Sequence, residues 1–282
     1  MGIRCTEDYS MTTQLDLCEL SNYESNVIHS NPARQGTRWP RRGLWLALLP
    51  LLLSGGYWPL AKDNPAANDL IGQLRKIPSS TLSDAMDEVL GKRGFMNHDM
   101  RPITKGRLVG RAKTVLFGPV TANAEQSKRG PLYAIQTIDE SGPGDVLVVA
   151  VGDPNVTGLG GLMATTAKVR GLAGVVVDGA VRDLDQIEEA GLIVFARSVS
   201  PSTMVGRYTS LAKNIPVSCA GVTVNPGDYI VGDRDGVVSI PAAHINAVLK
   251  RSIEMEETEK KMFPMIRKEK SLEKVINLFK RI

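Results

Sequence analysis

The sequence is poor in the residues that usually build disulfide frameworks and zinc sites. Its 282 residues include three cysteines, and Cys5 and Cys18 precede the apparent domain while Cys219 stands alone within it. No spacing of cysteines fits a disulfide framework or a zinc site. The three histidines are far apart in sequence: His29, His98 and His244. A metal site would therefore use oxygen ligands, which suit Mg²⁺ or Mn²⁺.

The sequence also lacks a basic stripe interleaved with aromatic residues. Aromatic residues make up 5% of the chain, and the net charge is a modest +4. Nucleic acid is therefore not an expected partner. Apolar residues account for 43% and charged residues for 23%, as in a soluble globular protein with a real core.

No apolar run reaches the roughly 20 residues of a membrane-spanning helix. A shorter run, Leu44–Leu53, follows Arg41-Arg42 and precedes Ser54-Gly55-Gly56, a pattern typical of a secretory signal. We expect residues 1–61 to be an N-terminal extension with a signal-like or anchor-like segment at 44–60. The chain would be exported or anchored if that segment is genuine, and cytoplasmic if it is a disordered extension or a start-site error. Any membrane contact would be through this segment alone.

Residues 62–282 are expected to form one domain. Asp69–Leu90 is helix-like with a break at Ile77-Pro78, and Gly106–Val120 suggests strand, turn and strand. From Val146 to Ala196, apolar runs alternate with helical segments, which predicts a parallel sheet with right-handed crossovers. The chain then becomes β-rich, and the charge-rich segment from Ala242 to about Ile282 predicts a helical tail.

A glycine-rich turn before a predicted helix is the first candidate binding element. Gly158, Gly160 and Gly161 precede the predicted helix Leu162–Arg170. Glycines let the backbone approach a ligand, and a helix start leaves N–H groups unpaired, so the turn could hold a carboxylate. The alternative is a simple tight turn. The glycine spacing is not that of a dinucleotide-binding fingerprint.

Arg182 and Asp183 follow the run Val175–Asp178 and the expected turn at Gly179-Ala180. An arginine at the carboxyl end of a parallel strand lies where open α/β sheets bind ligands, and its planar fork can hold a carboxylate. Asp183 can ligate a metal directly or through water. Alternatively, Asp183 caps the helix Leu184–Ala190 and Arg182 pairs with an acid. Asp178 is a second carboxylate, expected to stabilise the turn.

The run from Gly160 to Asp183 resembles the family of 4-hydroxy-4-methyl-2-oxoglutarate aldolases and RraA-like proteins, and the resemblance covers residues 69–270. Further segments carry it: Ser83–Asp87, Gly110–Thr114, Pro143–Leu147, Val217–Asp228 and Asp233–Pro241. The resemblance implies an α/β fold, a β/β/α sandwich of the swivelling-domain type, here with a C-terminal helical tail. It also implies a homotrimer or hexamer with active sites between subunits.

The resemblance further implies a divalent-metal-dependent lyase that cleaves a 2-keto acid through a pyruvate enolate. Its reaction would be retro-aldol cleavage of substrates like 4-hydroxy-4-methyl-2-oxoglutarate, decarboxylation of oxaloacetate, or both. By the family motif, Arg182 would bind the pyruvyl carboxylate and Asp183 would hold Mg²⁺ or Mn²⁺, largely through water. The backbone amides of Gly160, Gly161, Leu162 and Met163 would complete the carboxylate cradle.

The chain departs from the family motif at one position. The aldolases have an acid immediately after the first cradle glycine, where this chain has Gly161, so the proton relay is in question. They also use a glutamate from an adjacent subunit, which by position corresponds to Glu259, with Glu257 as a neighbouring possibility. The alternative function is an RraA-like regulatory or binding protein without lyase activity.

Overall fold

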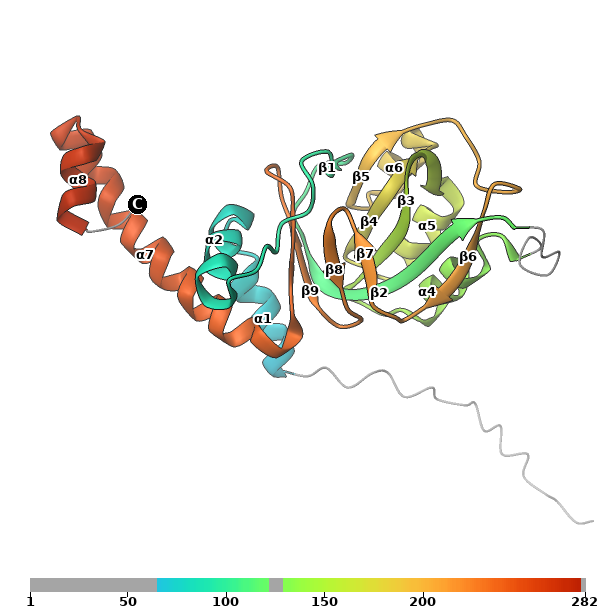
Figure 1. Cartoon of the computed structure of the whole chain (residues 1–282), viewed down its shortest axis with the longest axis horizontal. Helices are drawn as coiled ribbons and strands as arrows, with labels where there is room; N and C mark the ends of the chain where they lie inside the picture. Colours follow the sequence, from blue (N-terminus) through green and yellow to red (C-terminus); the bar gives the residue numbers. More distant parts are fainter. Residues whose placement is uncertain (1–64, 122–128, 280–282) are drawn as a thin grey trace, which may run out of the picture. The chain divides into compact units, whose positions relative to one another are not determined.

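The computed structural model describes residues 65–121 and 129–279 (Figure 1). Its main sheet has eight strands in the order β1-β5-β4-β3-β2-β9-β10, and β6 pairs with β2 off this path. The strands of the main sheet are β1 (Arg101–Pro102), β2 (Leu108–Pro119), β3 (Asp145–Leu159), β4 (Gly174–Val181), β5 (Val194–Val199), β6 (Tyr208–Lys213), β9 (Tyr229–Gly232) and β10 (Val237–Ile240). A separate hairpin pairs β7 (Val217–Cys219) with β8 (Val222–Val224).

Helices precede, separate and follow the strands along the chain. They are α1 (Pro65–Leu74), α2 (Ser79–Leu90), α4 (Leu132–Glu140), α5 (Gly161–Val169), α6 (Leu184–Ala190), a 3₁₀ turn (Ala242–His244), α7 (Ile245–Glu269) and α8 (Leu272–Phe279). The predicted break at Ile77-Pro78 separates α1 from α2, and the predicted helical tail is the pair α7 and α8.

The centre of the sheet is parallel, as the alternation of apolar runs and helical segments predicts. Strands β2, β3, β4 and β5 run parallel to one another, with α5 and α6 as the crossovers after β3 and β4. Every residue of β4 is buried, which is characteristic of a strand covered on both faces.

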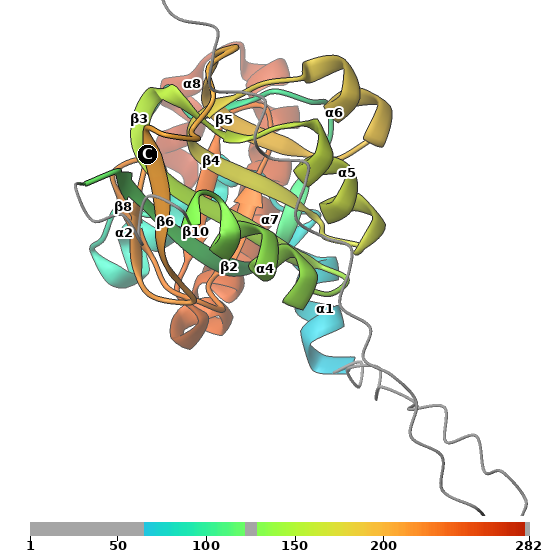
Figure 2. The ribbon, with the colours of Figure 1, turned by 90° about the vertical axis from the view of Figure 1, so that its right-hand side faces the viewer.

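Two layers cover the faces of the sheet. Helices α4, α5 and α6 lie along one face (Figure 2), where Leu147 and Val175 pack with Ala164 and Ile187. The hairpin β7–β8 covers the other face, and its Cys219 belongs to the core cluster of that side. Hairpin, sheet and helices form the β/β/α layering expected of the fold, and the mixed α/β class is confirmed.

A third core cluster joins α2, α7, β9 and β10. Leu82 and Met86 of α2 pack with Val248 and Leu249 of α7. Asp233, in the turn after β9, accepts hydrogen bonds from both the backbone N–H and the hydroxyl of Ser79, at 2.8 and 2.6 Å. Asp233 therefore caps the first turn of α2 from a distant part of the sequence.

Two expectations about strands are wrong, and two short strands were missed. Gly106–Val120 contains one long strand, β2, instead of two strands and a turn. Gly110 lies within this strand, where a Cβ would come within 2.2 Å of the Gly144 carbonyl oxygen. The glycine therefore allows the Gly144 backbone to approach the strand closely. Strand β4 continues through Gly179-Ala180 to Val181, so the predicted turn is absent. The short strands β1 and β6 were not predicted.

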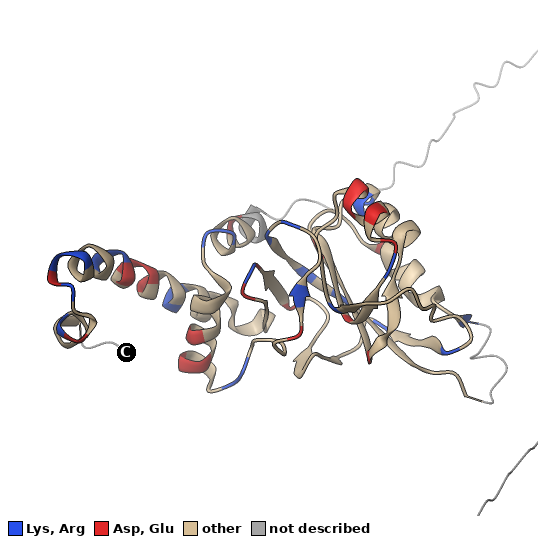
Figure 3. Ribbon diagram, turned by 90° about the horizontal axis from the view of Figure 1, so that it is seen from above, with Lys and Arg blue, Asp and Glu red and all other residues tan. Residues whose placement is uncertain are grey.

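The N-terminal extension, residues 1–61, with its apolar segment 44–60, lies outside the described residues. Within residues 65–121 and 129–279, no helix combines the length and the apolar character needed to cross a bilayer. Basic and acidic residues are interspersed along α7 (Figure 3).

Candidate functional site

The candidate site forms where two neighbouring parallel strands end. Leu159, the last residue of β3, pairs with Val181, the last residue of β4. Gly160 leads directly into α5, and Arg182 and Asp183 lead directly into α6. Because parallel strands end at the same edge of the sheet, the glycine turn and the Arg-Asp pair meet there.

Asp183 is held by the start of α5 and not by its own helix. It has φ 60° and ψ 47°, a left-handed conformation, and its side chain makes no capping hydrogen bond to α6. Its Oδ2 instead accepts a hydrogen bond from the Gly161 N–H at 3.1 Å. The expectation that Asp183 caps Leu184–Ala190 through its side chain is wrong. The carboxylate ties the two strand ends together.

Arg182 lies beside this carboxylate. Its Nε is 3.4 Å from Oδ2 of Asp183, and the two side chains are 41% and 37% exposed. Its Nη1 donates to the Ser202 carbonyl at 3.5 Å, a long contact. The guanidinium therefore keeps most of its donors available to a ligand.

Of the backbone N–H groups at the start of α5, one bonds to the protein and others face a possible ligand. The N–H of Ala164 bonds back to the Gly160 carbonyl, so the first three helical N–H groups have no partner within the helix. The N–H of Gly161 is donated to Asp183. The amides of Leu162 and Met163 remain for a ligand, while the amide of Gly161, one of the four that the resemblance implies, is engaged by Asp183.

Gly160 is required for the close approach of these groups. A Cβ at this position would lie 2.9 Å from Oδ2 of Asp183 and 3.3 Å from Nε of Arg182. The backbone has φ −129°, which any residue adopts, so the requirement is one of space. Any larger residue would push the carboxylate or the guanidinium away.

These groups line a cavity of about 280 Å³. Its floor is the Gly158–Met163 segment with Arg182 and Asp183, and apolar side chains form much of its wall. The apolar members are Ile135, Leu162, Met163, Met204 and Val205. Of these, Leu162 is 86% and Val205 64% exposed. The mouth of the cavity is therefore an exposed apolar rim around a polar floor.

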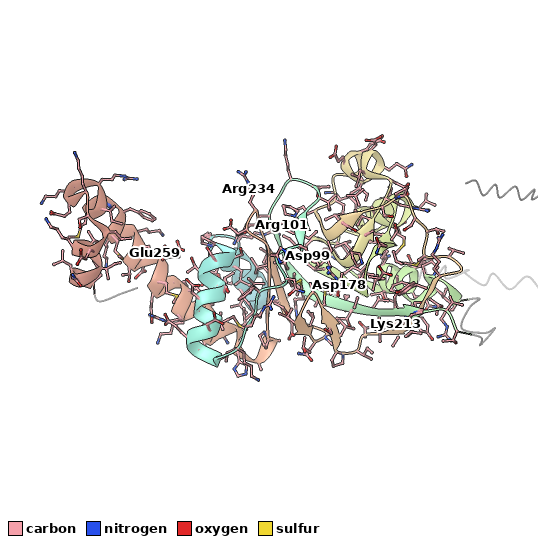
Figure 4. All side chains as sticks on the ribbon, turned by 45° about the horizontal axis from the view of Figure 1, so that its top comes forward. Asp99, Arg101, Asp178, Lys213, Arg234 and Glu259 are labelled. Atoms are coloured by element: carbon pink, nitrogen blue, oxygen red, sulfur yellow. The ribbon has the colours of Figure 1, made fainter. Side chains whose placement is uncertain are left out.

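Glu259 lies elsewhere in the chain, on α7 (Figure 4). It lines a different cavity, of about 420 Å³, together with the acidic residues Asp84, Asp87 and Glu88 of α2. Within one chain, the structure does not bring Glu259 to Arg182 and Asp183. Glu257 lies on the same helix, so it too is outside the cavity of Arg182 and Asp183.

Asp178 belongs to a buried network that the sequence did not reveal. It lies inside β4 and accepts a hydrogen bond from the Ala220 N–H at 3.0 Å. Arg197 of β5 pairs with Asp178 at 3.0 Å and with Asp99 at 2.7 Å. The hydrogen bond from Arg197 holds the pKa of the Asp99 carboxyl below its usual range. Asp178 therefore joins β4, β5 and the hairpin, and the expectation that it stabilises a turn is wrong.

The donor set around Asp183 fits a hard divalent cation. Both contacts of its carboxylate use Oδ2, which leaves Oδ1 for another ligand. In the described ranges, no group of three or more His, Cys, Asp and Glu side chains is assembled to hold a metal. Mg²⁺ commonly binds through one or two carboxylates and keeps several waters, so a single aspartate suits it.

A larger cavity of about 880 Å³ lies away from these residues. It is lined by the loop Pro102–Gly106, by Glu188 and by Arg234, among others. It contains no carboxylate beside free helix amides, so its chemistry is less specific than that of the smaller cavity.

Comparison with known proteins agrees with this architecture. The family model described as "RraA-like: Aldolase/RraA" matches residues 79–239. A protein of Halalkalibacterium halodurans named "Putative 4-hydroxy-4-methyl-2-oxoglutarate aldolase" is 34% identical over 190 residues, which are 65% of this chain and 82% of that protein.

Two solved structures are similar in fold. An uncharacterized protein from Pseudomonas syringae pv. tomato aligns with a TM-score of 0.66 at 28% identity, covering 75% of this chain and 94% of that one. RraAS2 of Streptomyces coelicolor, described as an unusual member of the RNase ES inhibitor RraA protein family, aligns with a TM-score of 0.62 at 27% identity, covering 72% and 98%. On the matched model, the fold and the relatives together, this chain belongs to the RraA-like family.

Proposed function

We propose that this chain is a divalent-metal-dependent lyase that releases pyruvate from a 2-keto acid. One observation carries the proposal: Arg182, Asp183 and the start of α5 share one small cavity. A guanidinium and free amides suit a carboxylate, and an oxygen donor beside them suits a metal. The similarity to a protein named as a 4-hydroxy-4-methyl-2-oxoglutarate aldolase supports a lyase.

Arg182 would bind the pyruvyl carboxylate of the substrate. Its planar fork can make two parallel N–H···O bonds, and its exposed side chain has donors to spare. The amides of Leu162 and Met163 at the helix start would add hydrogen bonds and the positive end of the α5 dipole. These contacts would fix the direction in which the 2-keto group points.

Asp183 would hold Mg²⁺ or Mn²⁺, largely through water. Such a cation supplies positive charge where the 2-keto oxygen becomes an enolate oxygen. The Gly161 N–H fixes the orientation of the carboxylate, and the Arg182 guanidinium lies beside it. The apolar wall, with Met163 and Met204, would exclude bulk water and strengthen these electrostatic contacts.

We propose further that the active protein is a homotrimer or hexamer with the site between subunits. The exposed apolar rim, with Leu162 and Val205, supports this because a second copy would cover it. Glu259 of a neighbouring copy is our candidate for returning a proton to the enolate carbon. A Glu259→Gln variant should then lower pyruvate release, while Glu257→Gln should not.

A regulatory protein without lyase activity is the second candidate. Gly161, where the aldolases carry an acid, favours it, as does the similarity to a member of an RNase inhibitor family. A partner bound equally well by wild type and Arg182→Ala, with no lyase activity in either, would favour this function.

The proposal is tested by pyruvate release from the full chain with Mg²⁺, with Mn²⁺ and with EDTA. Oxaloacetate and 4-hydroxy-4-methyl-2-oxoglutarate are the substrates, and release by the metal alone is subtracted. We expect release to stop with EDTA and to return when metal is added back. Full release in EDTA would refute metal dependence.

A further inference from the structure

Gln186 takes the space of the side chain that Gly161 lacks. A Cβ at position 161 would lie 1.8 Å from Oε1 of Gln186 and 2.8 Å from both its Cβ and its Cδ. The two residues therefore fit together: glycine makes room for the glutamine side chain, and the glutamine fills that room. Any side chain at 161 requires Gln186 to move.

The Gln186 side chain does not cap α6, the helix to which it belongs. Asp183 and Gln186 have the spacing of a capping box, in which each side chain would bond the backbone at the start of α6. Asp183 makes no such capping bond, and its carboxylate bonds the Gly161 N–H instead. Gln186 likewise has its amide against Gly161. Both side chains thus face the start of α5. Asp183 and Gly161 line the candidate cavity, and Gln186 lies against Gly161.

This arrangement leaves the cavity without a free proton acceptor among the described residues that line it. Among the described residues that line it, the ionisable ones are Arg182 and Asp183. Asp183 is engaged by Arg182 and the Gly161 N–H, and the proposed function assigns it to the metal. Gln186 carries an amide, which can orient a water molecule but does not take up a proton near neutral pH.

The two reactions under consideration differ in their need for a base. Cleavage of a 4-hydroxy-2-keto acid removes the proton of the C4 hydroxyl as the C3–C4 bond breaks and its electron pair moves onto the 2-keto oxygen. In a 2-keto acid with a carboxylate at C4, that carboxylate is already ionised. The same C3–C4 bond breaks and its electron pair moves the same way, so CO₂ leaves. A proton, which the proposed function assigns to Glu259 of a neighbouring copy, then completes C3. Only the first reaction requires a base at the start.

We propose that Gln186, seated against Gly161, makes this site selective for 2-keto acids whose C4 group is a carboxylate lost as CO₂. This inference rests on the proposed function and narrows its substrate class. A 4-hydroxy-2-keto acid fits the same carboxylate cradle, but the described residues that line the cavity offer no free group to accept its hydroxyl proton. Gln186 is a specificity-determining residue in this account.

The test compares kcat/KM for oxaloacetate and for 4-hydroxy-4-methyl-2-oxoglutarate in the full chain with Mg²⁺. The ratio of the two values is measured within one protein, so partial misfolding does not change it. A general base contributes about 10²- to 10⁴-fold, so wild type should prefer oxaloacetate by about 100-fold or more. Glu259→Gln should lower both values and leave the ratio unchanged.

Gln186→Glu replaces the side-chain amide by a carboxylate of the same shape. Gln186 is exposed, so the variant protein should fold. It should raise cleavage of the hydroxy acid relative to decarboxylation by about tenfold or more, and that activity should fall as the new carboxyl is protonated at low pH. Gln136→Glu on α4 is the matched control and should leave the ratio unchanged, because Gln136 neither lines the cavity nor is among the nearest neighbours of Gly161.

Comparable kcat/KM values for the two substrates in wild type would overturn the inference while leaving the lyase function intact. So would a ratio unchanged in Gln186→Glu, or selective loss of hydroxy-acid cleavage in Glu259→Gln, which would mean that another copy supplies the base. No pyruvate from either substrate would overturn the inference and the proposed function together.

Discussion

The backbone N–H of Gly161 donates a hydrogen bond to Oδ2 of Asp183 at 3.1 Å, which joins the end of β3 to the end of β4. One carboxylate thus caps a helix that begins 22 residues earlier in the chain. It does so from a left-handed backbone conformation that glycine, asparagine and aspartate tolerate better than other residues. The site and the local stability of the fold therefore share this residue.

Substitutions at Asp183 should separate these two roles. Asp183→Asn keeps an acceptor oxygen and tolerates the left-handed conformation, so stability should change little, while lyase activity should fall by about 100-fold or more because the charge is lost. Asp183→Ala should also lose about 2 kcal/mol of stability, from the lost cap and from backbone strain. Urea unfolding and pyruvate release measure the two effects. Equal stability of the two variants would contradict the capping role.

Arg182→Ala should raise KM for the 2-keto acid and lower kcat/KM by about 100-fold, since a charged hydrogen-bonding partner of the substrate carboxylate is lost. Arg182→Lys should recover only part of this, because an ammonium cannot form the two parallel bonds of a guanidinium. Arg207→Ala is the matched control: Arg207 is an exposed arginine that bonds the Thr203 carbonyl, and its loss should leave the kinetics unchanged. A wild-type KM in Arg182→Ala would exclude the assigned contact.

Asp233 should make stability depend on acid pH. Burial alone would raise the pKa of its carboxyl, but the hydrogen bonds from Ser79 and the nearby Arg107 outweigh burial and lower it. A lowered pKa in the folded state stabilises the fold above the unfolded value of about 3.9, and this stabilisation is lost as pH falls through the folded pKa.

We therefore expect Asp233→Asn to be less stable than wild type by about 1–2 kcal/mol at pH 7. The difference should shrink below about pH 4, as the wild-type carboxyl takes up its proton. Thermal unfolding of both proteins between pH 3 and pH 7 measures this. A difference that stays constant over that range would mean that the carboxylate charge does not stabilise α2.

Cys219 should resist thiol reagents in the native protein. Burial raises the pKa of its thiol far above the usual range, with the negative charge of Asp178 adding to the effect. In a Cys5→Ser, Cys18→Ser variant, a disulfide reagent should label no thiol until denaturant is added, since only the thiolate reacts. Rapid labelling under native conditions would show that the β7–β8 hairpin opens readily.

The parallel core could be predicted from the sequence, whereas the long-range side-chain contacts could not. The apolar runs of β3, β4 and β5 and the intervening helices follow from local patterning, and so does the meeting of Gly160 with Arg182 at one sheet edge. The partner of Asp183 could not be predicted, because a helix-capping rule considers only the adjacent helix. The positions of Arg197 and Asp99 beside Asp178 depend on tertiary packing in the same way.

The strand errors have a similar cause. Gly110 and Gly179 look like turn residues in isolation, yet each lies inside a strand where neighbouring groups approach closely. Gln186 gave no signal beyond its capping-box spacing, and that spacing pointed to α6 instead of to Gly161. The resemblance indicated that Gly161 was unusual, and only the structure indicated what fills its place.

The central claim is that the Arg182-Asp183 cavity releases pyruvate from a 2-keto acid with a divalent metal. The most direct test is the initial rate of pyruvate release from oxaloacetate by the full chain with Mg²⁺, beside Asp183→Asn at equal concentration and with metal-only release subtracted. We predict clear release by wild type, reduced by about 100-fold or more in the variant. Equal rates in the two proteins, or no release by a folded wild-type protein, would contradict the account.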